Sequence, residues 1–215
     1  MPGPLQIIAN AIEQETSLEI AVDKALTAFK SRNRGAAGHS LSSLKPRSGI
    51  DPLLESLVSQ AIRDDRFLPV FDLIAEREPG NANVYEAKAY AWAFEDSAEV
   101  VKALIQALAI LEERGGIQND LLGLYLWLGE TYEKQKELKQ AIAAYSMLLG
   151  YYREGVDDKK FHYQALYKRA HLYLDTNRND LARRDVAELY RVHKKGHPLE
   201  EVARELGRRS LEGED

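Results

Sequence analysis

The chain has 215 residues, no cysteine and a formal net charge of −5. The absence of cysteine excludes a disulfide framework and a thiolate zinc site, and the negative charge does not favour a dedicated nucleic-acid binder. Charged residues interrupt every apolar stretch before it reaches membrane-spanning length, and the first residues lack the basic start of a secretory signal. We therefore expect a cytoplasmic protein without a transmembrane segment, and helix-forming residues without strand-like alternation predict an all-α fold.

Residues 1–30 predict an N-terminal helical hairpin. Thr16 and Glu19 have the spacing of a capping box at the start of its second helix. An apolar stripe follows, formed by Leu18, Ala21, Val22, Ala25, Leu26 and Phe29. Because the hairpin is rich in Ile, one alternative function is self-association, in which it packs on a second copy to form a homodimer.

Residues 31–50 are rich in Ser and Gly and predict a linker or loop rather than part of the core. This segment carries four basic residues and no acid. A second alternative is therefore an arm that binds nucleic acid or another anionic surface. The arm would use Arg32, Arg34, Lys45 and Arg47.

Helical hairpins are expected to continue from residue 51 to 197. In residues 51–80, Pro69 fits the first turn of a second helix, where its missing N–H costs nothing. In residues 122–155, small and aromatic residues recur at the spacing that interlocks two antiparallel helices, with a turn near Gln135-Lys136. These residues are Tyr125, Leu128, Gly129, Tyr132, Ala141 and Tyr145.

This pattern resembles the tetratricopeptide repeat, and only the closing Pro is missing, since Arg153 stands in its place. Similar but weaker patterns occur in residues 84–117, around Ala91, and in residues 163–196, around Ala170. Ala91, Gly129 and Ala170 are spaced by 38 and 41 residues, more than the roughly 34 of the family. The resemblance implies a right-handed α-solenoid of antiparallel hairpins, with residues 198–215 as a C-terminal capping helix and tail.

No catalytic motif is found, and we expect neither an enzyme nor a bound cofactor or metal. Paired acids occur in predicted turns, and no Gly-rich phosphate loop precedes a helix. His193 and His197 are predicted to lie at a helix end, because Gly196 lies between them and Pro198 follows. For His162 and His171 we expect surface positions, one of them in a connector.

The resemblance implies that the protein functions in protein–protein interaction, as a noncatalytic adaptor or scaffold. In the family, the first helices of successive hairpins line a groove that holds a peptide or helix of a partner. Transferred to this chain, the groove consists of Tyr85, Lys88, Trp92, Leu126, Glu130, Tyr167 and His171. Trp92 is the expected anchor, unless it packs inside the repeat array, and Lys88 and Glu130 are expected to select the partner's sequence.

Overall fold

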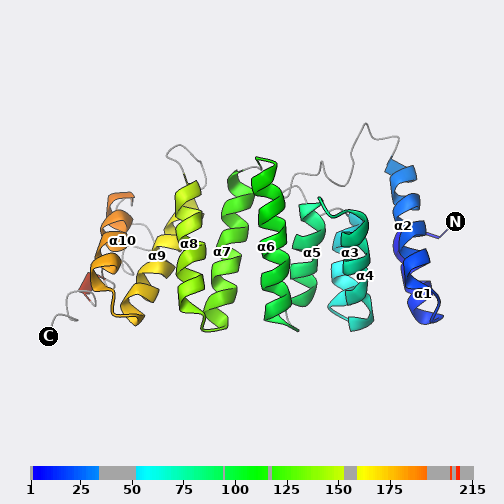
Figure 1. Cartoon of the computed structure of the whole chain (residues 1–215), viewed down its shortest axis with the longest axis horizontal. Coiled ribbons are helices and arrows are strands. Elements are labelled where there is room, and N and C mark those ends of the chain that lie inside the picture. The colour runs from blue at the N-terminus through cyan, green and yellow to red at the C-terminus, as the bar shows by residue number, and fades with distance from the viewer. Residues whose placement is uncertain are drawn as a thin grey trace. The chain divides into compact units, whose positions relative to one another are not determined.

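In a computed structural model of the chain, the described residues are 2–33, 52–93, 95–115, 118–152, 159–192, 204 and 207–208. These residues form ten α-helices and one short 3-10 helix, and none of them belongs to a β-strand (Figure 1). The predicted all-α fold of helix hairpins is confirmed. The chain divides into two compact units, Met1–Gly116 and Ile117–Asp215.

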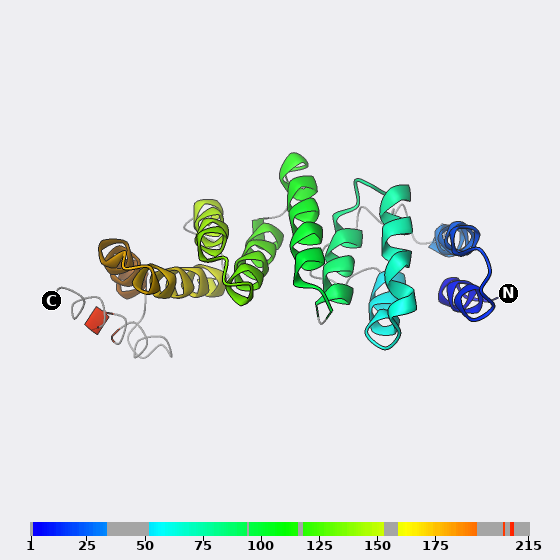
Figure 2. The same cartoon turned by 60° about the horizontal axis from the view of Figure 1, so that its bottom comes forward.

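Unit 1 contains six α-helices and the short helix η2. Their bounds are α1 Pro4–Glu13, α2 Leu18–Asn33, α3 Pro52–Ala61, η2 Asp65–Phe67, α4 Leu68–Arg77, α5 Ala82–Trp92 and α6 Ser97–Glu113. Helices α1 and α2 form a hairpin, in which α1 contacts α3 and α2 contacts α4. Helices α3 and α4 both pack on α5, which pairs with α6. Figure 2 shows α1 and α2, in blue, side by side.

One hydrophobic cluster holds unit 1 together. Ile8 and Val22 from the N-terminal hairpin share it with Leu57, Phe71 and Ile74, and all five side chains are fully buried. The N-terminal hairpin therefore belongs to the same core as the helices after the predicted linker, although it lacks the repeat pattern.

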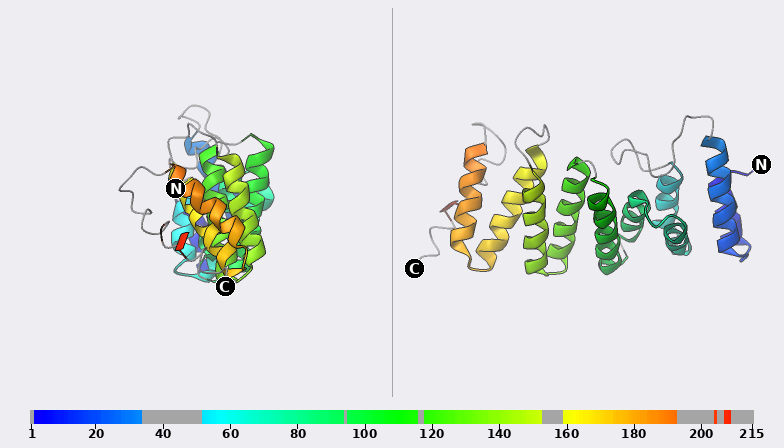
Figure 3. Two further views of the ribbon diagram at one scale, coloured as in Figure 1. Left: turned by 90° about the vertical axis from the view of Figure 1, so that its left-hand side faces the viewer. Right: turned by 45° about the horizontal axis from the view of Figure 1, so that its top comes forward.

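The described residues of unit 2 up to Val192 form two hairpins. Their helices are α7 Gln118–Lys134, α8 Leu138–Tyr151, α9 Lys159–Asp175 and α10 Asn179–Val192. Each helix packs on the next, and α7 also contacts α9. The right-hand view of Figure 3 shows these helices, coloured from green to orange, running alternately up and down. The first helices of the two hairpins are therefore neighbours.

The small residues of the repeat pattern allow the close approach that the sequence predicts. Ala91 and Ala170 are buried. At Gly129 a β-carbon would lie 2.3 Å from Cε1 of Tyr145, so only glycine leaves room for this ring. Gly129 and Tyr145 thus bring the two helices of the first hairpin of unit 2 together.

Three hairpins turn by the same backbone motif. After α7, the N–H of Glu137 donates to the carbonyl of Tyr132, and that of Lys136 donates to Glu133, both at 2.9 Å. This is a Schellman motif, which needs a left-handed residue at its centre. The central residues are Glu15, Lys136 and Asn177, with φ of 50°, 60° and 56°. The turn predicted near Gln135-Lys136 is confirmed.

The helix starts that the sequence predicts are confirmed in part. Pro69 lies in the first turn of α4, as predicted. The predicted capping box at Thr16 is wrong by one residue: α2 begins at Leu18, and Oγ of Ser17 accepts a hydrogen bond from the N–H of Ile20. The hydroxyl of Thr16 instead donates to the carbonyl of Ala11 in the last turn of α1.

Several predictions fall outside the described residues. Helix α2 continues to Asn33, three residues into the predicted linker, whereas Arg34, Lys45, Arg47 and the side chain of Arg32 are outside. His193 and His197 are outside as well, as is most of the predicted capping helix. Of the helices that are described, none is both long and apolar enough to cross a membrane.

Candidate functional site

The seven residues predicted for one groove belong to both units. Tyr85, Lys88 and Trp92 lie on α5 of unit 1, and the other four lie on α7 and α9 of unit 2. Each unit is therefore described by itself.

On α5, the spacing of Tyr85, Lys88 and Trp92 places the three side chains on one face of the helix. Both aromatic rings are half-buried and pack against the hydrophobic cluster of unit 1. The indole Nε1 of Trp92 is buried and has no hydrogen-bond partner in the described part of the chain. The buried part of the Trp92 side chain therefore packs in the core of unit 1.

Lys88 is held by carboxylates from the two neighbouring helices. Its Nζ lies 2.6 Å from Oδ1 of Asp72 on α4 and 3.4 Å from Oε2 of Glu99 on α6, and its side chain is only 15% exposed. The pKa of Glu99 is held below its usual value by the ammonium groups of Lys102 and Lys88. Lys88 thus connects three helices of unit 1.

In unit 2, polar side chains connect α7 with α9. Nζ of Lys168 lies 3.2 Å from Oε1 of Glu130 and 3.8 Å from Oε1 of Glu133. Glu133 also accepts a hydrogen bond from the hydroxyl of Tyr145 on α8, and burial and this carboxylate raise the pKa of Tyr145. These side chains retain partial exposure, 38% for Glu130 and 30% for Glu133.

Two rings lie next to Lys168 on α9. Tyr167 and His171 are one helical turn apart, and their ring centroids are 4.6 Å apart at 90°. Both side chains are half-exposed. We call Glu130, Glu133, Tyr167, Lys168 and His171 the α7–α9 surface.

Leu126, which was expected in the groove, is buried with 8% exposure, and Leu122 is completely buried. Leu126 therefore offers little of its own side chain to a partner.

Glu133 and Lys168 were not predicted from the sequence. Glu133 lies three residues after Glu130, so helical spacing alone indicates that the two share a face. Lys168 is adjacent to Tyr167 in sequence, but its pairing with α7 depends on how the two hairpins pack. A pattern within one helix does not contain that information.

The expectation of surface positions for both histidines of α9 is wrong for His162, and neither lies in a connector. His162 is 7% exposed, and its ring stacks on Tyr152 with centroids 4.0 Å apart. Its Nδ1 is buried without a hydrogen-bond partner among the described residues, and burial lowers its pKa. The aromatic stack explains why a histidine fits this interior position.

In the described ranges, no three His, Cys, Asp or Glu side chains come together as a potential metal site. The arrangement found on α7 and α9 instead offers hydrogen-bond donors, acceptors, both signs of charge and two rings. These groups suit the recognition of a polypeptide segment.

No family model matches the chain, and no curated protein matches it. Among solved structures, the chain is similar to MamA in its crystal structure, with 15% sequence identity and a TM-score of 0.44. The match covers 90% of this chain and 89% of that chain. Function is therefore inferred from the residues of this chain.

Proposed function

We propose that the chain is a noncatalytic interaction scaffold of the tetratricopeptide type, which binds a peptide segment or helix of a partner protein. The residue pattern around Gly129 supports this assignment, as does the hairpin geometry that the pattern predicts. In the family that the sequence resembles, the first helices of the hairpins contact the partner. In unit 2 these helices are α7 and α9.

The α7–α9 surface is the main structural support for this proposal. Its three charged groups already form a network, so their positions are fixed before a partner arrives, which lowers the entropic cost of binding. Tyr167 and His171 supply contact area with few rotatable bonds. In this proposal the rings provide affinity, and the charges of Glu130 and Lys168 select the partner's sequence.

In unit 1, the exposed parts of Tyr85 and Trp92 are proposed to contact the partner in the same way. Because both rings also pack on the core, alanine substitution there changes stability as well as binding. Unit 2 is therefore the better place for a test.

The test is quantitative affinity purification with mass spectrometry, comparing two double variants. Tyr167→Ala with His171→Ala removes both rings of the α7–α9 surface. Met147→Ala with Tyr190→Ala removes exposed side chains of α8 and α10, the second helices, which are 46% and 43% exposed. We expect the first variant to reduce recovery of the specific partner about tenfold or more. The second should retain it.

Helical content measured by circular dichroism should match the parent protein in both variants. Equal recovery of the partner by the two variants, or its loss only from the second, would contradict the placement of the binding surface on the first helices.

A further inference from the structure

The N-terminal hairpin carries a hollow on the face that points away from the core of unit 1. The hollow has a volume of about 550 Å³ and is lined by Pro2 and by residues of α1, α2 and their connection, among them the polar Asn10, Gln14 and Ser17. Ala11 and Ala21 lie at its buried base, and Ile7, Ile20 and Lys24 line it further out. It is separate from the α7–α9 surface, which belongs to unit 2.

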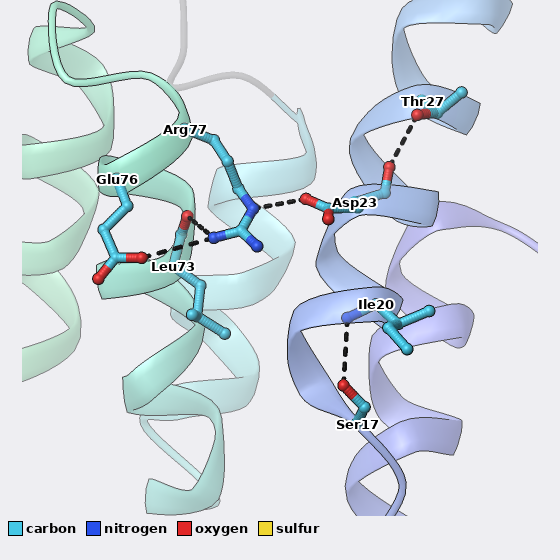
Figure 4. A network of polar contacts seen from close by, with 7 residues as sticks. All are labelled: Ser17, Ile20, Asp23, Thr27, Leu73, Glu76 and Arg77. Atoms are coloured by element: carbon cyan, nitrogen blue, oxygen red, sulfur yellow. Dashed lines mark hydrogen bonds and ion pairs between the residues drawn. The ribbon is translucent and has the colours of Figure 1, made fainter.

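Another face of the hairpin, with Val22, Ala25 and Leu26 of α2, packs in the hydrophobic cluster of unit 1. Nε of Arg77 on α4 lies 2.5 Å from Oδ1 of Asp23. In Figure 4, Asp23 reaches toward Arg77, whereas Ile20 points away from α4. Ile20 is 55% exposed, more than any other large hydrophobic side chain of the described ranges.

Two charged side chains, Lys24 and Glu15, lie at opposite ends of the hollow, and the other nearby acids interact with bases of unit 1. Glu13 and Glu19 interact electrostatically with Arg66 and Arg77 of the same unit. Lys24 lies about one helical turn, roughly 6 Å, beyond Ile20. Glu15 is exposed in the turn at the other end of the hollow, five residues before Ile20. In the described part of the chain, neither Lys24 nor Glu15 forms an ion pair.

We propose that this face binds the same face of a second copy of the chain, so that the protein forms a homodimer about a two-fold axis near Ile20. With a two-fold axis perpendicular to α2, the two copies of α2 run antiparallel. A residue that follows Ile20 in one copy then faces a residue that precedes Ile20 by a similar distance in the other copy. Ile20 then packs against Ile20 of the second copy and fills the hollow. Lys24 meets Glu15 of the second copy, and this pair occurs twice in the dimer.

This arrangement explains three features together. It covers the most exposed isoleucine of the described residues, and it fills a hollow with an apolar base. It also pairs two opposite charges that have no ion pair within the described chain. A self-complementary surface of this kind closes after two copies and does not form open filaments.

Sedimentation velocity over a range of protein concentrations tests the dimer in the full chain. The parent protein should shift from monomer to dimer as its concentration rises. Ile20→Glu places a charge in the apolar contact twice per dimer, so it should weaken association about a hundredfold or more. Ile62→Glu is the matched control, since Ile62 is 54% exposed and does not line the hollow, and it should dimerise like the parent.

Charge reversal tests the register. Lys24→Glu and Glu15→Lys should each weaken self-association, because each brings like charges together. An equimolar mixture of the two variants should form a heterodimer, because both contacts are then between opposite charges. A mixture that stays monomeric would contradict the proposed pairing.

A single introduced cysteine tests the axis, because the chain has no cysteine of its own. Ile20→Cys should form a disulfide-linked dimer under mild oxidation, whereas Ile62→Cys should not. A parent protein that remains monomeric at every concentration, or equal crosslinking of the two cysteine variants, would overturn the proposal.

Discussion

The ring of Tyr145 occupies the space that a β-carbon at Gly129 would need. Tyr145 is completely buried and forms a hydrogen bond with Glu133, so it has no free space to move into. Glycine in a helix costs roughly 1 kcal/mol relative to alanine. At this position that cost is offset by the closeness of the two helices.

We predict that Gly129→Ala destabilises the protein by about 1–3 kcal/mol, even though alanine is the better helix former. Gly150 provides the control, because a β-carbon there has no atom within 4 Å. Gly150→Ala should stabilise α8 by about 0.5–1 kcal/mol. Urea unfolding of both variants measures the difference, and a stabilising Gly129→Ala would show that Tyr145 does not pack as described.

The buried ring of His162 makes stability depend on pH. Its pKa in the folded protein lies below that of the unfolded chain because burial disfavours the imidazolium form. As the pH falls below about 6.5, the unfolded chain binds a proton that the folded protein does not. The folded state therefore loses stability from this pH downward, until the pH reaches the folded pKa.

We predict that His162→Phe, which retains a ring beside Tyr152, reduces this loss between neutral and mildly acidic pH. A single group contributes at most about 1.4 kcal/mol per pH unit. Urea unfolding of parent and variant at several pH values gives the difference in slope. Identical slopes would mean that His162 is accessible to water and to protons in the folded protein.

Among the helices, α9 is fixed to its neighbours by a buried ion pair. Nε and Nη2 of Arg169 donate to Asp185 on α10 at 2.8 and 2.7 Å, and Nη1 donates to Ser146 on α8 at 2.9 Å. The guanidinium also lies over the ring of Tyr173. One side chain of α9 thus contacts both helices that flank it.

We predict that Asp185→Ala destabilises unit 2 by about 3–5 kcal/mol, because it leaves the guanidinium of Arg169 buried without its carboxylate. Replacing both partners, Arg169→Met with Asp185→Leu, should recover most of the loss. Thermal and urea unfolding measure both effects. If the double variant were as unstable as the single one, the loss would come from packing and not from the unpaired charge.

The attachment of the N-terminal hairpin rests on apolar contacts rather than on its ion pair. Asp23 is 60% exposed where it meets Arg77, and exposed pairs contribute little. Leu26 on the same helix is 6% exposed and belongs to the core cluster. We predict that Leu26→Ala costs about 2–5 kcal/mol, whereas Asp23→Ala changes stability little, as measured by urea unfolding. The reverse order would indicate that the salt bridge holds the hairpin.

The sequence predicts features that lie within one helix or one hairpin. Helical spacing places Tyr85, Lys88 and Trp92 on one face, and the pattern around Gly129 predicts that the two helices of its hairpin interlock. Contacts between hairpins are not encoded in such patterns. The ion pair between Lys168 on α9 and Glu130 on α7 is an example, because these helices belong to different hairpins and are distant in sequence. Burial of His162 was missed for the same reason, and the cap at Ser17 was missed because Thr16, also a favourable capping residue, has Glu19 at the spacing of a capping box.

At the scale of the molecule, each unit has its own reason to bind other chains. Unit 2 exposes a fixed set of charges and rings on its first helices, and unit 1 exposes a hollow with an apolar base on its N-terminal hairpin. We propose that the first surface binds a different protein and the second binds another copy of this chain. A homodimer would present two α7–α9 surfaces and so could bind a bivalent partner more tightly than a monomer does.

Site-specific photocrosslinking in cells tests the central claim most directly. A photoreactive residue replaces Tyr167 on α9 in one protein and Met147 on α8 in another, so the two probes report on a first and a second helix of the same unit. The account predicts a covalent adduct with a partner protein from position 167 and little or none from position 147. An adduct that forms only from position 147, or equally from both, would contradict it.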